Sequence, residues 1–218
     1  MSLRGLIFDV DGVLTDTVPL HYEAWKRMFS EFGYSFNPDI YRAKVDGKSR
    51  LDGVRGVMAD ATEDVITRAG EIKQGYYLEQ LESVELSPFS DAARLVHHAA
   101  SAGLRLAAAS GSRNSPQVLR KIGLIDQMAA VVTGGDVPHG KPEPDIFLEA
   151  AARMSLEPTT CVVFEDAEAG VEAAKRGGFS CVGVDRDGGG QFLAGADMVV
   201  ASLDEIDLDS LRRLVVAE

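Results

Sequence analysis

This chain of 218 residues has few cysteines and no long hydrophobic run. No apolar stretch reaches the roughly 18 residues that a membrane-spanning helix requires, so we expect no membrane partner. The two cysteines form neither a CxxC motif nor a Cys/His metal pattern, and each precedes a valine at an expected strand start. We therefore interpret Cys161 and Cys181 as buried reduced thiols rather than as a disulfide.

Basic residues are also scarce. The chain has 22 Lys and Arg against 34 Asp and Glu, a formal net charge of −12, and its basic residues are scattered. This balance argues against a nucleic-acid-binding surface, so any anionic substrate must be held by local groups. Residues 1 to 4 lead directly into an apolar run and leave no room for a signal peptide, so we expect a cytoplasmic protein. We also expect a monomer.

What is present is a hydrophobic content of 45%, enough for a substantial core plus an insertion. From Pro88 onward, strand-like and helix-like segments alternate. The expected strands are residues 104 to 109, 130 to 133, 161 to 164, 181 to 184 and 198 to 200, and the expected helices are about 90 to 102, 115 to 122, 144 to 154 and 168 to 176. Such alternation predicts a parallel sheet with right-handed crossovers.

Residues 17 to 84 contain no strand-like stretch. Apolar residues first recur there at spacings of three and four, at Tyr22, Trp25, Phe29 and Phe32, until Gly33 ends the run. Breaks near Asp46 and Asp60 then predict a bundle of about four helices. We therefore expect an α/β fold with a doubly wound, Rossmann-like parallel-sheet core (residues 1 to 16 and 85 to 218) and an inserted all-helical cap (residues 17 to 84).

The N-terminal segment Leu6-Ile7-Phe8-Asp9-Val10-Asp11-Gly12 combines a buried strand with two carboxylates at its end. Asp9 and Asp11 should point to the same side, at the carboxyl edge of the sheet where ligands bind in open α/β folds. Two such charges about 4 Å apart repel by about 4 kcal/mol at an effective dielectric of about 20, so the pair needs a cation or a raised pKa. The alternative is a strand-end turn with solvated aspartates.

Three further strand ends carry polar groups. Ser110 opens the loop Ser110-Gly111-Ser112-Arg113-Asn114, which either cradles a phosphate or caps a helix. Lys141 precedes a proline-primed helix start, where a lone lysine is usually solvated. Glu165 and Asp166 end another strand, where they alternatively form a helix N-terminal charge pair. Because parallel strands bring their carboxyl ends to one rim, all these groups should converge, and that many carboxylates predict a Mg²⁺ site for phosphoryl transfer.

In this order, the motifs Asp9-Val10-Asp11-Gly12-Val13, Ser110, Lys141 and Glu165-Asp166 resemble those of the haloacid dehalogenase superfamily of aspartate-nucleophile phosphotransferases. The resemblance covers essentially the whole chain. It implies that Asp9 is the nucleophile and a magnesium ligand, and that Asp11 is the general acid and base and binds Mg²⁺ through its carbonyl. It further implies that Glu165 and Asp166 complete the magnesium ligands, while Ser110 and Lys141 neutralise charge on the transferred group.

Within that superfamily the chain resembles the β-phosphoglucomutases and their phosphatase relatives. The segments that suggest this are Asp16-Thr17, His21-Tyr22-Glu23-Ala24-Trp25-Lys26, Gly47-Lys48-Ser49-Arg50, Lys73 and Lys141-Pro142-Glu143-Pro144-Asp145-Ile146-Phe147. By this resemblance Thr17 and His21 are a hinge and orienting pair. Without it, Thr17 reads as a helix N-cap and His21 as a polar residue on a helix face.

The resemblance also assigns substrate contacts. Arg50 and Lys73 of the cap would bind a non-transferring phosphate, unless they are solvated helix charges, and Ser112 and Asn114 would contact a phosphate or sugar oxygen. One departure concerns the substrate: Asp46 stands where the mutases tend to carry a basic residue.

The leading hypothesis is a Mg²⁺-dependent sugar-phosphate mutase acting on a small phosphorylated metabolite, with a sugar-phosphate phosphatase as the alternative. A phospho-receiver domain is a different class, but it predicts no helical insertion after the first strand. A catalytically dead binding relative conflicts with the intact Asp9, Asp11, Lys141 and Asp166. The sequence leaves open the sugar, its anomer and the pathway.

Overall fold

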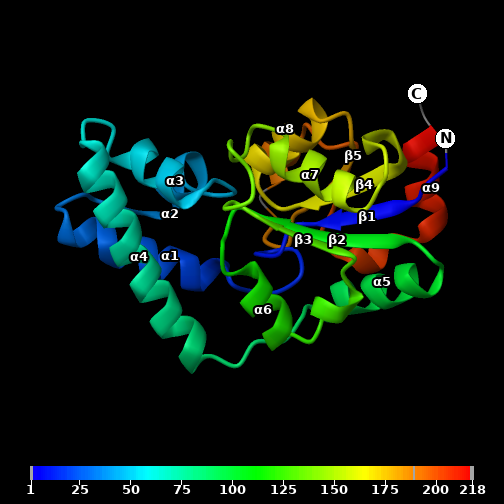
Figure 1. Ribbon diagram of the computed structural model, residues 1–218, viewed down its shortest axis with the longest axis horizontal. Coiled ribbons are helices and arrows are strands. Elements are labelled where there is room, and N and C mark those ends of the chain that lie inside the picture. The colour runs from blue at the N-terminus through cyan, green and yellow to red at the C-terminus, as the bar shows by residue number, and fades with distance from the viewer. Residues whose placement is uncertain (1, 189, 217–218) are drawn as a thin grey trace.

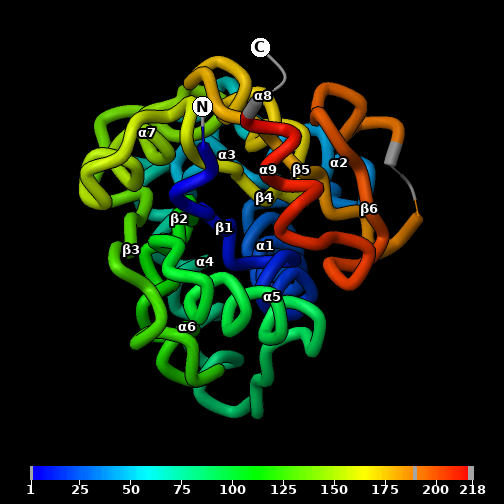
Figure 2. Tube along the Cα trace, turned by 90° about the vertical axis from the view of Figure 1, so that its right-hand side faces the viewer, coloured from blue at the N-terminus to red at the C-terminus, as the bar shows by residue number. Residues whose placement is uncertain are grey.

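A six-stranded parallel sheet forms the centre of the protein in a computed structural model, which describes residues 2–188 and 190–216. Its strands are β1 (Gly5–Phe8), β2 (Arg105–Ser110), β3 (Ala130–Thr133), β4 (Cys161–Glu165), β5 (Ser180–Val184) and β6 (Met198–Val200). The order across the sheet is β3-β2-β1-β4-β5-β6. Figure 2 views the sheet from its end and shows β1 in the middle, flanked by β2 and β4. Strands β2 and β3 extend the sheet on one side of β1, and β4, β5 and β6 extend it on the other. The loop after β1 therefore lies at the switch point of the strand order, where such folds bind ligands.

Helices cover both faces of this sheet (Figure 1). On one face, α7 (Asp145–Arg153) and α8 (Glu168–Arg176) pack on a core that includes Ile7, Val163 and Cys181. On the other face lie α5 (Ser90–Ser101), α6 (Ser115–Lys121) and α9 (Leu208–Val216). Alternate residues of each strand point to opposite faces, and apolar residues on both sides explain why the strands read as continuous hydrophobic runs.

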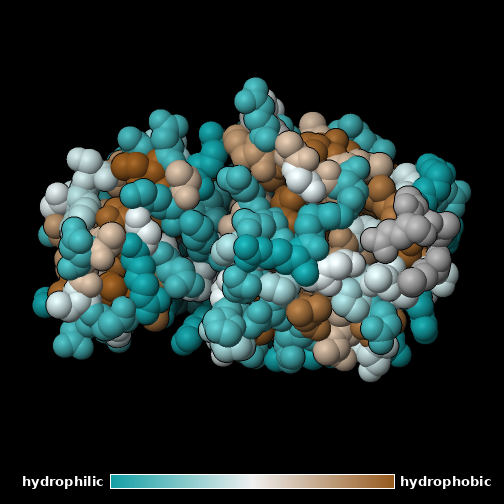
Figure 3. All heavy atoms as spheres, turned by 90° about the horizontal axis from the view of Figure 1, so that it is seen from above, coloured by the Kyte–Doolittle hydropathy of each residue, from teal (hydrophilic) through white to brown (hydrophobic). Residues whose placement is uncertain are grey.

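The helical insertion consists of α1 (Val18–Glu31), α2 (Pro38–Lys44), α3 (Arg50–Val57) and α4 (Glu63–Ser83). It has a hydrophobic core of its own, in which Trp25, Phe29, Val54 and Ile66 are buried. Figure 3 shows the insertion and the sheet region as two lobes of unequal size, with mostly hydrophilic side chains along the line where they meet. The insertion is therefore a cap beside the carboxyl end of the sheet.

The two chain segments that join cap and core run side by side. Thr15 forms an isolated bridge with Pro88, and its hydroxyl donates to the carbonyl of Ser87 over 2.8 Å. On the core side, Lys121 donates to the carbonyls of Leu81 and Val84, at the end of α4. These contacts hold the base of the cap against the core.

The fold class is confirmed: the core is a Rossmann-like parallel sheet with an inserted helical cap. The strands and helices expected from the sequence agree with the structure to within one or two residues at each end, and both cysteines are buried and free. The boundaries at residues 16/17 and 84/85 stay predictions. The sequence analysis missed α9, a short helix that covers the sheet with Leu208, Leu211 and Val215. No helix in the described part of the chain is long and apolar enough to cross a membrane.

Candidate active site

Asp9 follows β1 directly and is held in a buried network with Lys141. The Lys141 ammonium donates to Asp9 Oδ1 over 2.5 Å and also to the carboxylate of Glu165. The backbone N–H of Asp11 donates to Asp9 Oδ2 over 2.9 Å. Burial raises the pKa of Asp9 to about 8, Lys141 opposes this, and repulsion from Glu165 and Asp11 adds to it. The sequence alternative of a solvated lysine is wrong, since the Lys141 side chain is only 1% exposed.

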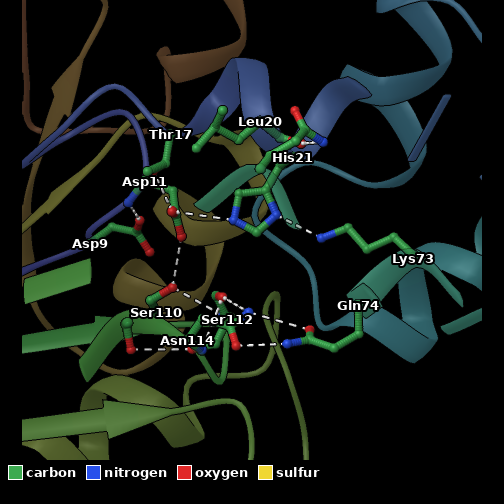
Figure 4. Close-up of polar contacts among 12 residues, drawn as sticks. Asp9, Asp11, Thr17, Leu20, His21, Lys73, Gln74, Ser110, Ser112 and Asn114 are labelled. Atoms are coloured by element: carbon green, nitrogen blue, oxygen red, sulfur yellow. Dashed lines mark hydrogen bonds and ion pairs between the residues drawn. The ribbon is translucent and has the colours of Figure 1, made fainter. Parts of the chain in front are cut away.

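Asp11 lies beside Asp9 but has different partners (Figure 4). Its Oδ1 accepts from the Thr17 hydroxyl over 2.5 Å, and its Oδ2 accepts from the Ser110 hydroxyl over 3.0 Å. His21 Nε2 lies 3.3 Å from Oδ1, near enough for an ion pair but without the geometry of a hydrogen bond. Burial alone would raise the pKa of Asp11, but His21 together with the two hydroxyl donors outweighs it and holds the pKa below its usual range.

Behind Asp11, His21 connects the core to a buried lysine of the cap. Lys73 Nζ lies 2.8 Å from His21 Nδ1, and the His21 ring stacks on Tyr77 with 4.1 Å between ring centroids. Burial lowers the pKa of Lys73 to about 7. Burial also lowers the pKa of His21, and the nearby positive charge of Lys73 lowers it further. If Lys73 is the donor, Nδ1 is the acceptor and His21 carries its proton on Nε2, facing Asp11. Lys73 is therefore not a solvated helix charge.

Asp166 approaches the Asp9–Asp11 loop through Gly12. A Cβ atom built on Gly12 would lie 1.9 Å from Asp166 Oδ2, so only glycine leaves room for this carboxylate, and the φ of +83° at Gly12 is also one that favours glycine. Glu165, by contrast, is fully buried against Lys141 and the N–H of Ala167. The two adjacent carboxylates thus have different partners.

The carboxylates fit a hard divalent cation. Burial, followed by repulsion from Asp46, Glu165 and Asp9, raises the pKa of Asp166 well above its usual range, and a cation would relieve that repulsion. Among the residues described, no three His, Cys, Asp or Glu side chains converge tightly enough to hold an ion by themselves. This suits Mg²⁺, which commonly takes one or two carboxylates and completes its shell with water and substrate phosphate.

At the far end of the same cavity, positive charge gathers near Glu71, and no carboxylate of the described residues hydrogen-bonds to this charge. Arg50 of α3 and Arg113 of the loop after β2 lie near each other, and burial together with Arg113 lowers the pKa of Arg50. Arg50 Nε is buried and has no hydrogen-bond partner among the described residues. Asn114 lies there too, with its N–H and side-chain amide directed to the Ser112 hydroxyl. This end of the cavity can bind an anion.

One cavity of about 480 Å³ between cap and core joins these two ends. Of the residues singled out from the sequence, it is lined by Asp9, Asp11, His21, Arg50, Lys73, Ser110, Ser112, Asn114 and Asp166. Thr17, Lys141 and Glu165 lie behind this lining and support it. Asp46 also lines the cavity, and burial followed by repulsion from Glu165 raises its pKa to about 7.

Sequence reasoning missed two residues of this cavity. Arg113 stands between Ser112 and Asn114, in a loop already singled out for phosphate binding, so its position could have been noticed. Gln74 follows Lys73 in α4 and gives no sequence signal of its own. Only the structure shows that its amide reaches the core.

The chain is similar to known sugar-phosphate enzymes. It is 33% identical over 218 residues to the β-phosphoglucomutase of Bacillus subtilis (strain 168), across 96% of this chain and 94% of that protein. It is 35% identical over 185 residues to the fructose-1-phosphate phosphatase of Escherichia coli (strain K12), across 83% and 95% of the two chains. The structure of β-phosphoglucomutase from Clostridium difficile matches with a TM-score of 0.89 and 25% identity, across 99% of this chain and 98% of that one.

The family model described as haloacid dehalogenase-like hydrolase matches residues 3–178, a span that contains the sheet strands β1 to β4, the whole cap and the carboxylates of the cavity. With that match and these relatives, the chain belongs to the haloacid dehalogenase-like hydrolase family.

Proposed function

We propose that this protein transfers a phosphoryl group through Asp9 on a small phosphorylated sugar, with Mg²⁺ as cofactor, and that it works as a mutase. The observation that carries the proposal is the contrast between two neighbouring carboxylates. Asp9 is held by a buried ammonium group, while Asp11 accepts from two hydroxyl donors and lies beside His21, which together favour its ionised form. One is placed to attack phosphorus and the other to move a proton.

The cycle begins with phosphorylated Asp9. A sugar hydroxyl attacks the phosphorus, the bond between Asp9 Oδ and phosphorus breaks, and the hydroxyl proton passes to Asp11. The bisphosphorylated sugar then presents its other phosphate, Asp9 attacks it, and Asp11 returns the proton to the leaving oxygen. Ser110 and Lys141 donate hydrogen bonds to the oxygens of the transferring group. Asp9, Asp166 and the Asp11 carbonyl would hold Mg²⁺, which would supply charge neutralisation there. Glu165, also expected as a ligand, supports the site through Lys141 instead.

The cap supports a mutase because one of its loops contacts the core beside the site, from where further closure would shield the site from water. Cβ atoms built on Gly111 and Gly140 would lie 3.1 Å from the Lys48 carbonyl and from Ser49 Cβ, so the cap loop rests directly on core backbone. Such closure excludes water, which would otherwise hydrolyse phosphorylated Asp9. We place the cap at residues 17 to 84 and the core at residues 1 to 16 and 85 to 218. Since residues of one chain supply every group named here, we propose a monomer.

A phosphatase is the second candidate, and Asp46 favours it. An acidic side chain in the cavity wall would accept hydrogen bonds from sugar hydroxyls but repel a second phosphate nearby. Among the relatives, both mutases and phosphatases occur.

The test compares wild type with Asp9→Asn, using the exposed Asp126→Asn as a matched control, in a screen of sugar phosphates with Mg²⁺. We expect Asp9→Asn to lose turnover and Asp126→Asn to keep it. Following free phosphate and isomer separately then decides the class: isomer without phosphate release identifies a mutase, and phosphate release alone identifies a phosphatase. Unchanged turnover in Asp9→Asn would refute the proposed chemistry.

A further inference from the structure

Gln74 makes a bridge from the cap to the core at the anion-binding end of the cavity. Its Nε2 donates to Asn114 Oδ1 over 2.7 Å, and its Oε1 accepts from Asn114 Nδ2 over 3.3 Å. The same Oε1 accepts from Arg50 Nη1 over 2.6 Å. Figure 4 shows the Gln74 amide extending from α4 toward Asn114. One neutral side chain thus occupies donors from both sides of the cavity.

Those donors are the ones that a second anionic group of a substrate would need. A phosphate oxygen accepts from guanidinium and amide N–H groups in the same way as the Gln74 carbonyl oxygen does. Arg50 and Arg113 lie near each other, and Arg50 Nε is buried without a hydrogen-bond partner in the described part of the chain. Glu71 lies close enough to offset part of this charge, but the Arg50 guanidinium donates its hydrogen bond to the neutral Gln74 amide.

We propose that Gln74 is an internal competitor for this anion site and thereby sets how strongly the protein prefers a substrate with a second phosphate. A bisphosphorylated sugar must displace the Gln74 amide from Asn114 and Arg50. A sugar that carries only the phosphate to be transferred to unphosphorylated Asp9 leaves the amide in place, so the cap stays bridged to the core and the donors stay satisfied. Gln74 is thus a specificity-determining residue, and its effect on substrate choice rests on the proposed function above.

The test uses two variants that change the competitor in opposite directions. Gln74→Ala removes it, and Gln74→Glu replaces it with a carboxylate that pairs with Arg50 and repels anions. Gln80→Ala is the control, because Gln80 lies on the same helix and, among the described residues, its side-chain amide donates to the Leu20 and Tyr76 carbonyls rather than to a residue of the anion site. The probe is inorganic sulfate, titrated without Mg²⁺ and followed by the fluorescence of Trp25, the only tryptophan, which lines the cavity.

We expect Gln74→Ala to bind sulfate about three- to tenfold more tightly than wild type, the size of one ordinary net hydrogen bond. Gln74→Glu should bind it more weakly by a similar factor, and Gln80→Ala should match wild type. With sugar substrates given to unphosphorylated protein, the rate of phosphoryl transfer to Asp9 from glucose 1,6-bisphosphate relative to that from glucose 6-phosphate should shift in the same directions.

Unchanged sulfate affinity in both Gln74 variants, or weaker binding in Gln74→Ala, would overturn the inference, because the amide would then organise the site rather than compete for it. Failure of the proposed function would appear differently, as absence of Mg²⁺-dependent turnover in wild type. The sulfate titration needs no turnover, so its result stands in either case.

Discussion

Replacing Lys141 with methionine should lower the free energy of unfolding, because two buried carboxylates of the site lose their shared positive partner. Lys141 is the positive charge between two buried carboxylates, Asp9 at 6% exposure and Glu165 at 0%. Methionine keeps most of the side-chain volume and the contact with Phe147, over whose ring the ammonium lies at 4.9 Å. The variant therefore removes charge and little packing.

Removing one partner of a buried ion pair typically costs about 3 to 5 kcal/mol, because the remaining charge is left without compensation. Here two carboxylates lose the same partner, so we expect a loss of about 4 kcal/mol in the free energy of unfolding at about pH 8. The pKa of Asp9 is about 8 even with Lys141 in place, and without it Asp9 should remain protonated to still higher pH. A carboxyl group with a raised pKa in the folded state favours folding at low pH and loses that contribution as the pH rises. Because this loss ends near pH 8 in wild type and continues to higher pH in the variant, the penalty should grow as the pH rises above about 8.

Urea unfolding followed by circular dichroism, at about pH 8 and about pH 9.5 without Mg²⁺, measures this penalty. Lys121→Met is the control: Lys121 donates to two neutral carbonyls, so its removal should cost about 1 kcal/mol at both pH values. Adding Asp9→Asn to Lys141→Met should restore part of the stability at pH 8. A loss for Lys141→Met that is below about 1 kcal/mol, or equal at both pH values, would refute the reasoning.

Two further predictions concern the carboxylates. Excess Mg²⁺ should raise the melting temperature, and this rise should grow as the pH increases from about 5 to 8. The reason is that the ion must displace protons from carboxyls such as Asp9 and Asp166, whose pKa values are raised by burial. A shift that does not depend on pH would contradict this. Gly12→Ala should lower stability by about 2 kcal/mol and weaken Mg²⁺ binding measured by calorimetry, since its Cβ would overlap Asp166 at a positive φ. Gly75→Ala, where a Cβ meets nothing within 4 Å, should leave Mg²⁺ binding unchanged.

The fold could be predicted from the sequence because its strands are buried on both faces and its helices have clear starts and stops. The short apolar run before Asp9 and the Gly33 that follows α1 at a φ of +78° are two such signals. The helix α9 did give a comparable signal that was overlooked, because Leu208, Leu211 and Val215 recur at spacings of three and four, as the apolar residues of α1 do.

The candidate site was predictable to the extent that strand ends deliver it. Asp9, Ser110 and Asp166 all follow or end strands, so a parallel sheet brings them to one edge. The cap residues depend on how two lobes meet, which no local pattern encodes. Lys73 was expected to face a substrate phosphate, and the structure places its ammonium against His21, while Gln74 beside it reaches Asn114.

The central claim is that phosphorus becomes bonded to Asp9. The direct measurement is to mix the protein with Mg²⁺ and a bisphosphorylated sugar, quench with acid within milliseconds, and locate the modification by peptide mass spectrometry. We predict one added phosphoryl group on the peptide that contains Asp9, absent when Asp9→Asn is used. A phosphoryl group found only on another residue, or turnover with no modified peptide at any quench time, would contradict it.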